Sequence, residues 1–572
     1  MRLHSRTALL CHEYLHKTHA PDLFDIDWEM EESEIAKEFK RQGQTHEETV
    51  IDYLLSLEGT RIQDLRNVSG QEHATATALL SPDLDIILGA YIDEECEKEI
   101  FRALGIAPGG DPLRVSRPDL LVRVGMSSLG TPLWAPVDIK SHGAFATNQS
   151  NSVRLSPLEE LSPFSGVEEN GRISQEDAFQ LAHYFRHLES LGLANEGHWV
   201  GIIGRDYEEC AWSILDKVVF GVGARKQDAV TAYNRAFLEA KRIIDLARAR
   251  NENPSLPPPT MPQSFTGKFG CAGCEFKDVC EEEMNEFGNG SGHVTLLATV
   301  TPDKAKKHFP TIQSIAELAE ALDLTPFGMT ATLRAQVWLD EIPRLIDPTA
   351  PLTIPEFDIE IDIDLENSQA ALQEIDEDEV VGRDQVYLYG YGVHDRGASS
   401  DWRTADFQSI WDYSNSPAGE LEVLLKMWRT LEEIVESAHK ANKTVGIFHY
   451  SHHERTWWRK FETRYAGLPG VPTEDQIEEF MDKYFVDLLL IARLISFPTS
   501  GYSIKSLAPL AGFDWEVDEA GGAMSLVKYK TAVSGISSPD ERADAIEWLR
   551  AYNLDDVRAT FVVRDYLRNL PL

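Results

Sequence analysis

Cysteine is scarce in this chain: six residues of 572 are cysteine. That number is too small for a disulfide-stapled scaffold of this length, so the sequence excludes that class of protein. Cys96 and Cys210 have no cysteine neighbour in sequence, and we expect both to be ordinary buried thiols. The other four cysteines are spaced in a way that needs a separate explanation.

Basic residues are also few, with 54 Lys and Arg against 94 Asp and Glu, a net charge of −40. This balance excludes a protein that coats nucleic acid over its whole surface. It permits a nuclease, because such an enzyme needs carboxylates to hold metal and only a local basic groove for phosphates.

Long apolar runs are missing as well. The longest candidate, residues 486–495, is too short to cross a bilayer and contains Arg493. The first twenty residues lack the pattern of a secretory leader, so we expect a cytoplasmic protein without membrane contact. No GxxxxGK[ST] motif occurs, and unwinding of a duplex would therefore need a separate helicase.

What is present is an alternation of helical and strand-like segments typical of α/β proteins. We expect helices at residues 33–57 (broken near Gly43), 175–191 and 226–250, and strands at 119–124, 134–139, 198–204, 357–363, 386–393 and 444–449. Proline-rich connectors at 251–265 and 340–355 divide the chain. We therefore predict a first domain at 1–290, a helical linker at 291–352 and a second domain at 353–572.

The first candidate site lies on a predicted hairpin. Asp119 starts one strand, and Asp138 and Lys140 lie two residues apart on the next, so their side chains leave the same face. Two carboxylates and a lysine are the grouping that metal-dependent phosphodiester hydrolysis requires. Taken alone, Asp138 and Lys140 are equally well explained as an ion pair at a strand end.

Further residues extend this pattern. Gln180 and Tyr184 share one face of a predicted helix, and His46 lies upstream, three residues after Gly43. The order Gly-x-x-His, Asp, Asp-x-Lys, Gln-x-x-x-Tyr resembles the RecB-type branch of the PD-(D/E)xK nucleases, which have a restriction-endonuclease-like fold. The resemblance implies roles for six residues: His46, Asp119 and Asp138 as ligands of Mg²⁺ or Mn²⁺, Lys140 as a catalytic residue, and Gln180 and Tyr184 as contacts to DNA.

The second candidate site is the cluster Cys271-x₂-Cys274-x₅-Cys280. Three thiolates this close can share one metal centre, either structural zinc or an iron–sulfur cluster. Zinc sites usually pair two Cys-x₂-Cys arms, and only one arm is present here. Cys11, before the predicted nuclease, is the candidate fourth ligand. One cysteine before the nuclease and three after it resemble the iron–sulfur RecB-type nucleases, which implies a structural [4Fe–4S] cluster, with zinc as the alternative.

The third candidate site is in the second domain. Asp358 and Glu360 share a face of a predicted strand, and Tyr552 and Asp556 are four residues apart on a predicted helix. Because the strand belongs to a dense acidic run, a solvated surface explains it equally well. The order Asp-x-Glu, then Tyr-x₃-Asp, resembles the RNase H-like exonucleases of the DEDD type, in which four carboxylates hold two metal ions and the tyrosine orients water. The resemblance implies catalytic roles for Asp358, Glu360, Tyr552 and Asp556.

The middle ligand of this third site departs from that family's aspartate. Glu454 stands at the matching place and is the expected metal ligand, with Asp487 as the alternative. Over nearly its full length the chain resembles stand-alone RecB-like nucleases with a second, RNase H-like domain. The resulting hypothesis is a metal-dependent nuclease acting on single-stranded DNA or DNA ends in repair or processing. The alternatives are an RNA 3′–5′ exonuclease driven by the second domain, and a catalytically inactive nucleic-acid-binding scaffold.

Overall fold

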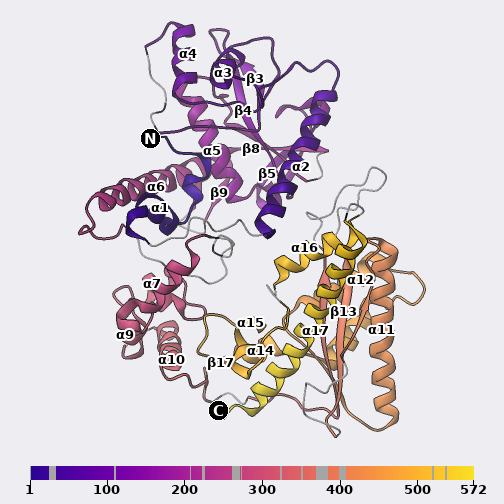
Figure 1. Ribbon diagram of the computed structural model, residues 1–572. Helices are drawn as coiled ribbons and strands as arrows, with labels where there is room; N and C mark the ends of the chain where they lie inside the picture. Colours follow the sequence, from indigo (N-terminus) through magenta and orange to yellow (C-terminus); the bar gives the residue numbers. More distant parts are fainter. Residues whose placement is uncertain are drawn as a thin grey trace. The chain divides into compact units, whose positions relative to one another are not determined.

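The computed structural model describes residues 2–24, 34–107, 111, 113–205, 208–221, 226–259, 271, 274–322, 325–349, 352–368, 384–397, 407–517, 521–534 and 537–571. The chain forms two compact units, Met1–Met261 and Pro262–Leu572 (Figure 1). The boundary lies earlier than the residue 290 expected from the sequence, so the cysteines at 271–280 belong to the second unit.

The first unit is built on a mixed sheet of eight strands in the order β1-β2-β3-β4-β7-β8-β5-β6. Its centre is the predicted hairpin, in which β3 and β4 are antiparallel, while β4 runs parallel to β7. The strands of this unit are β1 (Ile62–Asp64), β2 (Ile86–Leu88), β3 (Leu120–Met126), β4 (Pro132–Ile139), β5 (Ala146–Pro157), β6 (Val167–Arg172), β7 (Trp199–Ile203) and β8 (Glu209–Ile214), with a separate pair β9 (Val219–Phe220) and β10 (Gln227–Asp228).

Six α-helices of the first unit lie around this sheet: α1 (His12–His19), α2 (Glu34–Ser56), α3 (Gln71–Leu79), α4 (Glu94–Leu104), α5 (Gln175–Ser190) and α6 (Ala229–Glu252). The chain between the parallel strands β4 and β7 forms β5, β6 and then α5, and Ser174 caps the first turn of α5. The break expected near Gly43 is wrong, since α2 continues through this residue. A lone glycine costs a helix only about 1 kcal/mol, which the rest of α2 offsets.

The second unit begins with short helices and continues into a five-stranded sheet. The leading elements are α7 (Lys277–Gly290), α8 (Pro302–His308), α9 (Ile315–Ala319), α10 (Pro326–Asp340) and β11 (Arg344–Leu345). The sheet has the order β14-β13-β12-β15-β16, in which β12, β13 and β14 are antiparallel, and β12, β15 and β16 are parallel. Its strands are β12 (Ile359–Asn367), β13 (Val386–Asp395), β14 (Phe407–Trp411), β15 (Val445–His449) and β16 (Phe485–Asp487).

Long helices cover the two faces of this second sheet. Figure 1 shows α17 (Pro539–Asn569) crossing one face, while α11 (Pro417–Lys440) packs on β13 from the other. Gly390 on β13 allows α17 to approach, because a Cβ there would lie 2.2 Å from Asn553 Oδ1. The remaining elements are α12 (His453–Tyr465), α13 (Glu474–Tyr484), α14 (Leu488–Ala492), β17 (Ile495–Ser496), α15 (Ile504–Leu507) and α16 (Gly522–Val533).

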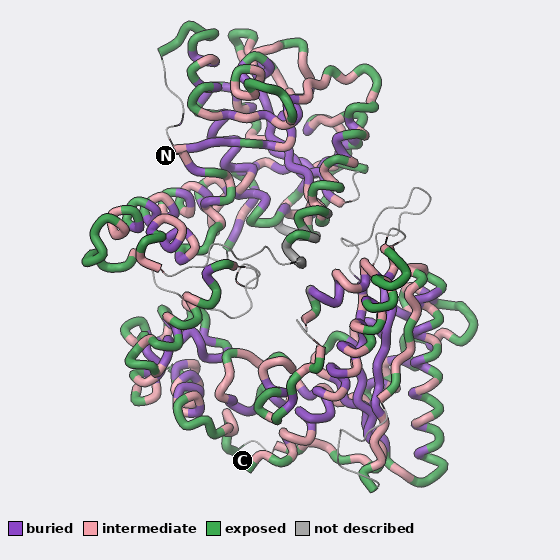
Figure 2. The backbone as a smooth tube through the Cα atoms, viewed as in Figure 1, coloured by how far each residue is buried: buried purple, intermediate pink, exposed green. Residues whose placement is uncertain are grey.

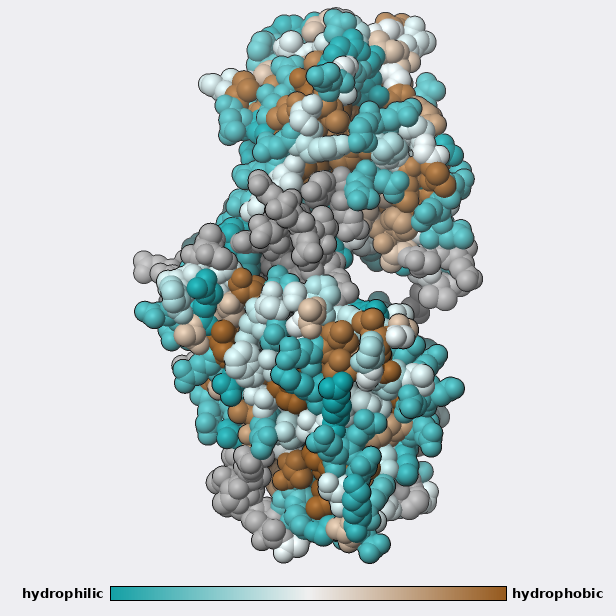
Figure 3. Space-filling model, turned by 90° about the vertical axis from the view of Figure 1, so that its right-hand side faces the viewer, coloured by the Kyte–Doolittle hydropathy of each residue, from teal (hydrophilic) through white to brown (hydrophobic). Residues whose placement is uncertain are grey.

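Burial follows these layers, with the central strands of each sheet buried and the outer helix faces exposed (Figure 2). The face drawn in Figure 3 carries mainly hydrophilic side chains with scattered apolar ones, in keeping with the acidic composition. Among the helices that the structure describes, none combines the length and apolarity needed to cross a bilayer.

Candidate active sites

The central strand β12 carries four acidic residues on one face. Its sequence IEIDIDLEN alternates, so the apolar side chains of Ile361, Ile363 and Leu365 enter the core beneath α11. The acidic side chains face α17 instead, and they are Glu360, Asp362, Asp364 and Glu366. The role of each carboxylate depends on which side chain of α17 lies opposite it.

The first two carboxylates of this row have arginine partners. Arg564 Nη1 donates to both oxygens of Asp362 at 2.6 and 2.7 Å. Arg568 donates to Glu360 at 2.7 and 3.0 Å. Burial alone would raise the pKa of Glu360, but the two arginines outweigh it and lower that pKa. Glu360 therefore belongs to a structural ion-pair cluster.

The other two carboxylates meet an acid instead of arginines. Asp364 and Glu366 converge with Asp556 of α17, and one oxygen from each lies within 4.8 Å of the others. Asp364 also accepts a hydrogen bond from Asn553 at 2.8 Å, and Asp556 accepts one from the indole of Trp515 at 2.7 Å. Within the described ranges, this trio is the only group of three such side chains that could hold a metal ion.

The pKa values of the three carboxylates are raised. Burial and the Asp556 carboxylate raise the pKa of Glu366 to about 8. Burial raises that of Asp556 to about 6, although Lys505 opposes the shift. The pKa of Asp364 rises well above its ordinary value because of burial and the charges of Asp556, Glu366 and Glu454. Buried carboxylates that repel one another in this way are suited to bind a divalent cation.

Glu454 lies near this trio, at the start of α12. It is buried, its Oε2 is 3.3 Å from His449 Nδ1, and its charge acts on Asp364. Asp487, the alternative middle ligand, has a structural role instead: Oδ1 accepts the backbone N–H groups of Ser451 and Leu489 and caps α14. The geometry thus favours Glu454 over Asp487.

Tyr552 lies one helical turn before Asp556 and is buried against Trp548, with ring centroids 5.2 Å apart. Its hydroxyl hydrogen-bonds Asp556, which lowers the pKa of that acid and raises the pKa of the tyrosine, after the larger effects of burial. The structure therefore brings together Tyr552 and Asp556 as the sequence predicted.

Asp358 and Glu360 are not part of this centre, which corrects the sequence prediction. Asp358 is exposed before β12, and its Oδ2 accepts two hydrogen bonds from Thr444, each 2.8 Å long. The acid pair that meets Asp556 lies six residues further along, at Asp364 and Glu366. Because the strand repeats acidic residues at every second position, spacing alone could not select the pair.

In the first unit, the predicted hairpin brings its three candidate residues together. Pairing of Leu120 with Val137 places Asp119 across from Asp138, and Asp119 Oδ2 accepts the backbone N–H of Ile139 at 2.8 Å. Lys140 Nζ lies 3.2 Å from Asp138 Oδ2. Burial and the Asp138 charge raise the pKa of Asp119, whereas Lys140 opposes that rise.

α5 supplies side chains that position this lysine. Lys140 Nζ donates to Gln180 Oε1 at 3.0 Å, and Gln180 Nε2 donates to the Tyr184 hydroxyl at 2.9 Å. Tyr184 is buried and also hydrogen-bonds Ser5 at 3.2 Å. In this conformation Tyr184 therefore reaches the site through Gln180 and has no face open to DNA.

His46 does not complete a ligand trio with the two aspartates in the described part of the chain. It is half-buried inside α2. Its neighbour Glu47, which the sequence analysis missed, is close enough for the charges of Asp138 and Lys140 to act on it, and burial raises its pKa first. The only sequence signal for Glu47 is its position beside His46.

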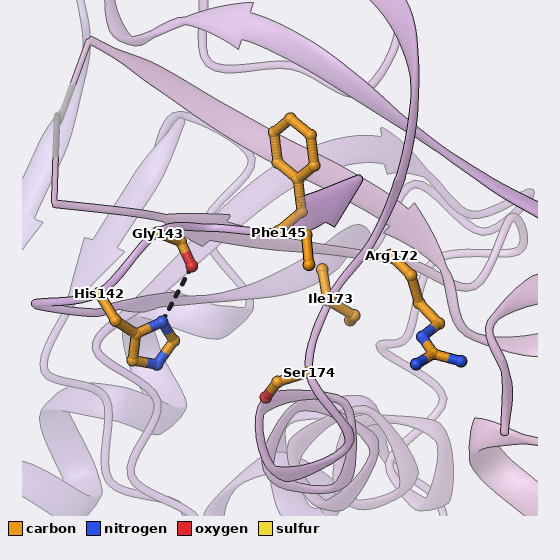
Figure 4. Close-up of a pocket in the computed structure, with 7 residues that line it drawn as sticks. His142, Gly143, Phe145, Arg172, Ile173 and Ser174 are labelled. Carbon is orange, nitrogen blue, oxygen red and sulfur yellow. Dashed lines mark hydrogen bonds between the residues drawn. The ribbon is translucent and has the colours of Figure 1, made fainter. Parts of the chain in front are cut away.

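A cavity of about 350 Å³ opens next to this hairpin site (Figure 4). His142, two residues beyond Lys140, lies on one side of it, and Arg172 and Phe145 line other parts. His142 Nδ1 is 2.9 Å from the Gly143 carbonyl, and Nε2 is 3.5 Å from Asp177, whose hydrogen bond raises the histidine pKa. An imidazole, a guanidinium and an aromatic ring thus surround one cavity.

The four candidate cluster cysteines are divided between the two units. Cys274 N–H donates to the Cys271 carbonyl at 3.3 Å, and Cys280 lies in the first turn of α7, its N–H bonded to the Phe276 carbonyl at 2.9 Å. These three side chains are half-exposed, while Cys11 is exposed at the N-cap of α1 in the first unit. Among the described residues, these three thiols do not form a group whose sulfur atoms all lie within 4.8 Å of one another. Thiolates are the donor type of iron–sulfur and zinc sites, so the cluster stays a prediction from the sequence.

Comparison with known proteins bears on the second unit. Residues 409–568 match the family model of the RNase H superfamily. The unit therefore contains an RNase H-like domain, a class that indicates nuclease-type activity on nucleic acid. The match begins after β12 and β13, which belong to the same five-stranded sheet as β14, β15 and β16. No curated protein and no solved structure matches the chain.

Proposed function

We propose that this protein is a Mg²⁺- or Mn²⁺-dependent nuclease that acts on single strands or ends, with its main catalytic centre at Asp364, Glu366 and Asp556. The observation that supports this proposal is the convergence of Asp364 and Glu366 of β12 with Asp556 of α17, a helix whose Asp556 lies within the RNase H match. Glu454 is the fourth acidic residue of the centre. A bound divalent cation would supply electrostatic stabilisation of the charge that develops on the phosphate.

The other residues of the centre hold these groups in place. Tyr552 and Trp515 each hydrogen-bond Asp556 and so fix its carboxylate, while Asn553 fixes Asp364. With its hydroxyl beside Asp556, Tyr552 is placed to orient an attacking water molecule. Burial of Glu366 and Asp556, with Asp364 half-buried, limits the screening by bulk water of the charges that the reaction requires.

For the first unit we propose a second, RecB-type nuclease site at Asp119, Asp138 and Lys140, with His46 or Glu47 as the further ligand. Its support is the hairpin that places the buried Asp138, the half-buried Asp119 and a lysine together. We also propose that Cys271, Cys274 and Cys280, with Cys11, hold a [4Fe–4S] cluster, zinc being the alternative. DNA is the substrate we favour for the first site, in repair or processing.

Cleavage of end-labelled single-stranded DNA and of RNA of the same sequence tests these assignments in the full chain. Asp364→Asn and Asp138→Asn, singly and together, separate the two centres. The matched control is Asp358→Asn, an exposed aspartate just before the same strand. We expect the double variant to lose at least roughly 100-fold of its metal-dependent cleavage while the control keeps it.

The results of these assays distinguish the alternative functions. Loss of RNA cleavage in Asp364→Asn alone would favour an RNA 3′–5′ exonuclease in the second unit, and loss only in Asp138→Asn would move the main centre to the first. Wild-type protein that binds both substrates without cutting either is the scaffold alternative. Full activity in the double variant contradicts both sites.

A further inference from the structure

Lys505 lies beside the carboxylate trio of the second unit, and neither the sequence analysis nor the RNase H match assigns it a role. Its ammonium nitrogen is 4.7 Å from the centroid of the Tyr552 ring and 5.2 Å from that of Trp515. Both rings belong to side chains that hydrogen-bond Asp556. The lysine is therefore held against the two residues that position a proposed metal ligand.

The backbone at this lysine is well anchored. Ser503 caps the short helix α15, and Leu507, two residues after Lys505, is fully buried in the core that α17 also contacts. The side chain itself is only half-buried. A fixed backbone with a half-buried charged side chain is the arrangement expected of a residue that meets a ligand.

The charges of Asp556, Glu366 and Asp364 all act on Lys505, against burial, which lowers the lysine pKa. The lysine charge in turn lowers the pKa of Glu366 and of Asp556, against the larger effect of burial. The neighbouring carboxylates on β12 show how this fold neutralises acids that have only a structural role: Arg564 forms two hydrogen bonds of 2.6 and 2.7 Å to Asp362. Lys505 instead carries a compact charge on a four-carbon stem over two ring faces, and rotation of that stem can direct the charge toward a bound phosphate.

We propose that Lys505 is a further catalytic residue of this centre, whose ammonium group contacts the phosphate that is cleaved while Tyr552 and Trp515 hold it there. The inference rests on the proposed nuclease function of the second unit. Once divalent cations neutralise the carboxylates, the attraction between the acids and the lysine weakens, and a bound phosphate becomes its best partner. Its positive charge then stabilises the negative charge that grows on the phosphate during cleavage.

The test uses the full chain with Asp138→Asn in every sample, so that the first unit does not contribute cleavage. Lys505→Ala, Lys505→Met and Lys505→Arg are compared with the background protein for kcat, KM and Mn²⁺ affinity, the last measured by electron paramagnetic resonance. Lys483→Ala is the matched control, since Lys483 lies 5.0 Å from the ring of Tyr484 on α13, outside the acidic centre.

We expect Lys505→Ala and Lys505→Met to lower kcat roughly 100-fold, as removal of one transition-state contact does, with Lys505→Arg recovering at least a tenth of the activity. Mn²⁺ should bind the alanine and methionine variants at least as tightly as the background protein, because a competing cation is gone. Lys505→Met retains the apolar stem and so keeps the test valid should the alanine variant fold poorly.

A kcat within threefold of the background value in Lys505→Met would overturn the inference. Equal loss of Mn²⁺ binding and of cleavage would overturn it too, because the lysine would then only support the carboxylates. Failure of the proposed function gives a different result. In that case the Asp364→Asn variant would cleave as well as the background protein, independently of the substitutions at Lys505.

Discussion

Replacing Glu366 with glutamine should stabilise the metal-free protein in alkaline solution. Folding moves the pKa of Glu366 from its ordinary value of 4.5 to about 8, through burial and the nearby Asp556 charge. The folded state thus binds this proton more tightly than the unfolded chain does. The contribution of Glu366 to the free energy of unfolding is fully present below pH 4.5 and is lost as the pH rises through about 8.

A shift of that size corresponds to at most about 5 kcal/mol between the two ends of the pH range. Other acidic groups share this repulsion. We therefore expect Glu366→Gln to raise the free energy of unfolding by on the order of 2–3 kcal/mol at pH 9 and by almost nothing at pH 5. For a unit of this size that is a rise of roughly 3–5 °C in Tm. Mg²⁺ should stabilise the wild-type protein at pH 9 and the variant much less.

Calorimetry of the full chain in EDTA and in Mg²⁺, at pH 5 and pH 9, measures these differences, with Asp138→Asn in every sample. The control is Glu360→Gln, on the same strand face, where Arg564 and Arg568 lower the pKa instead. Removing that charge leaves buried arginines without their partner, so this variant should be less stable at both pH values. A Glu366→Gln protein that is no more stable than its parent at pH 9 in EDTA would refute the reasoning.

Three other predictions concern the remaining sites. Lys140→Ala should remove the single-stranded DNA cleavage that survives in Asp364→Asn while leaving the Tm within a few degrees, and undiminished cleavage in an end-labelling assay would exclude the first site. Cys274→Ser should bleach an absorbance near ~400 nm expected of anaerobically purified protein, whereas a colourless, zinc-loaded wild type would favour zinc. Arg564→Met should cost roughly 3–5 kcal/mol by leaving Asp362 buried without its partner, and Asp362→Asn in the same chain should recover part of it in urea unfolding. No recovery in that double variant would mean that the arginine acts through packing alone.

The hairpin site of the first unit could be predicted from sequence because its geometry is local. A short turn joins β3 and β4, so pairing of adjacent strands brings Asp119 to Asp138 without any distant information. The contact of Gln180 with Lys140 joins β4 to α5, the helix that precedes its parallel neighbour β7 in the chain. Glu47 was not predictable in this way, since α2 reaches the hairpin only through tertiary packing.

The acidic centre of the second unit could be predicted only in part. The strand β12, the helical turn of Tyr552 and Asp556, and Glu454 were all expected, yet the acid pair was placed six residues too early. Every second residue from Asp358 to Glu366 is acidic, so local spacing offers several equivalent pairs. The choice among them is made by α17, whose arginines neutralise Glu360 and Asp362 and whose Asp556 meets the other two.

This dependence on α17 has a consequence for the order of folding. Arg564 and its partner Asp362 are separated by 202 residues, so β12 is synthesised long before the residues that neutralise its acidic row. Until then, four carboxylates stand along one face of the central strand, about 7 Å from one to the next, and repel each other. The sheet of the second unit should therefore fold late during synthesis, and docking of α17 should be the last step of its assembly. A nascent chain stalled before α17 emerges would have a loosely held β12 and no assembled acidic centre.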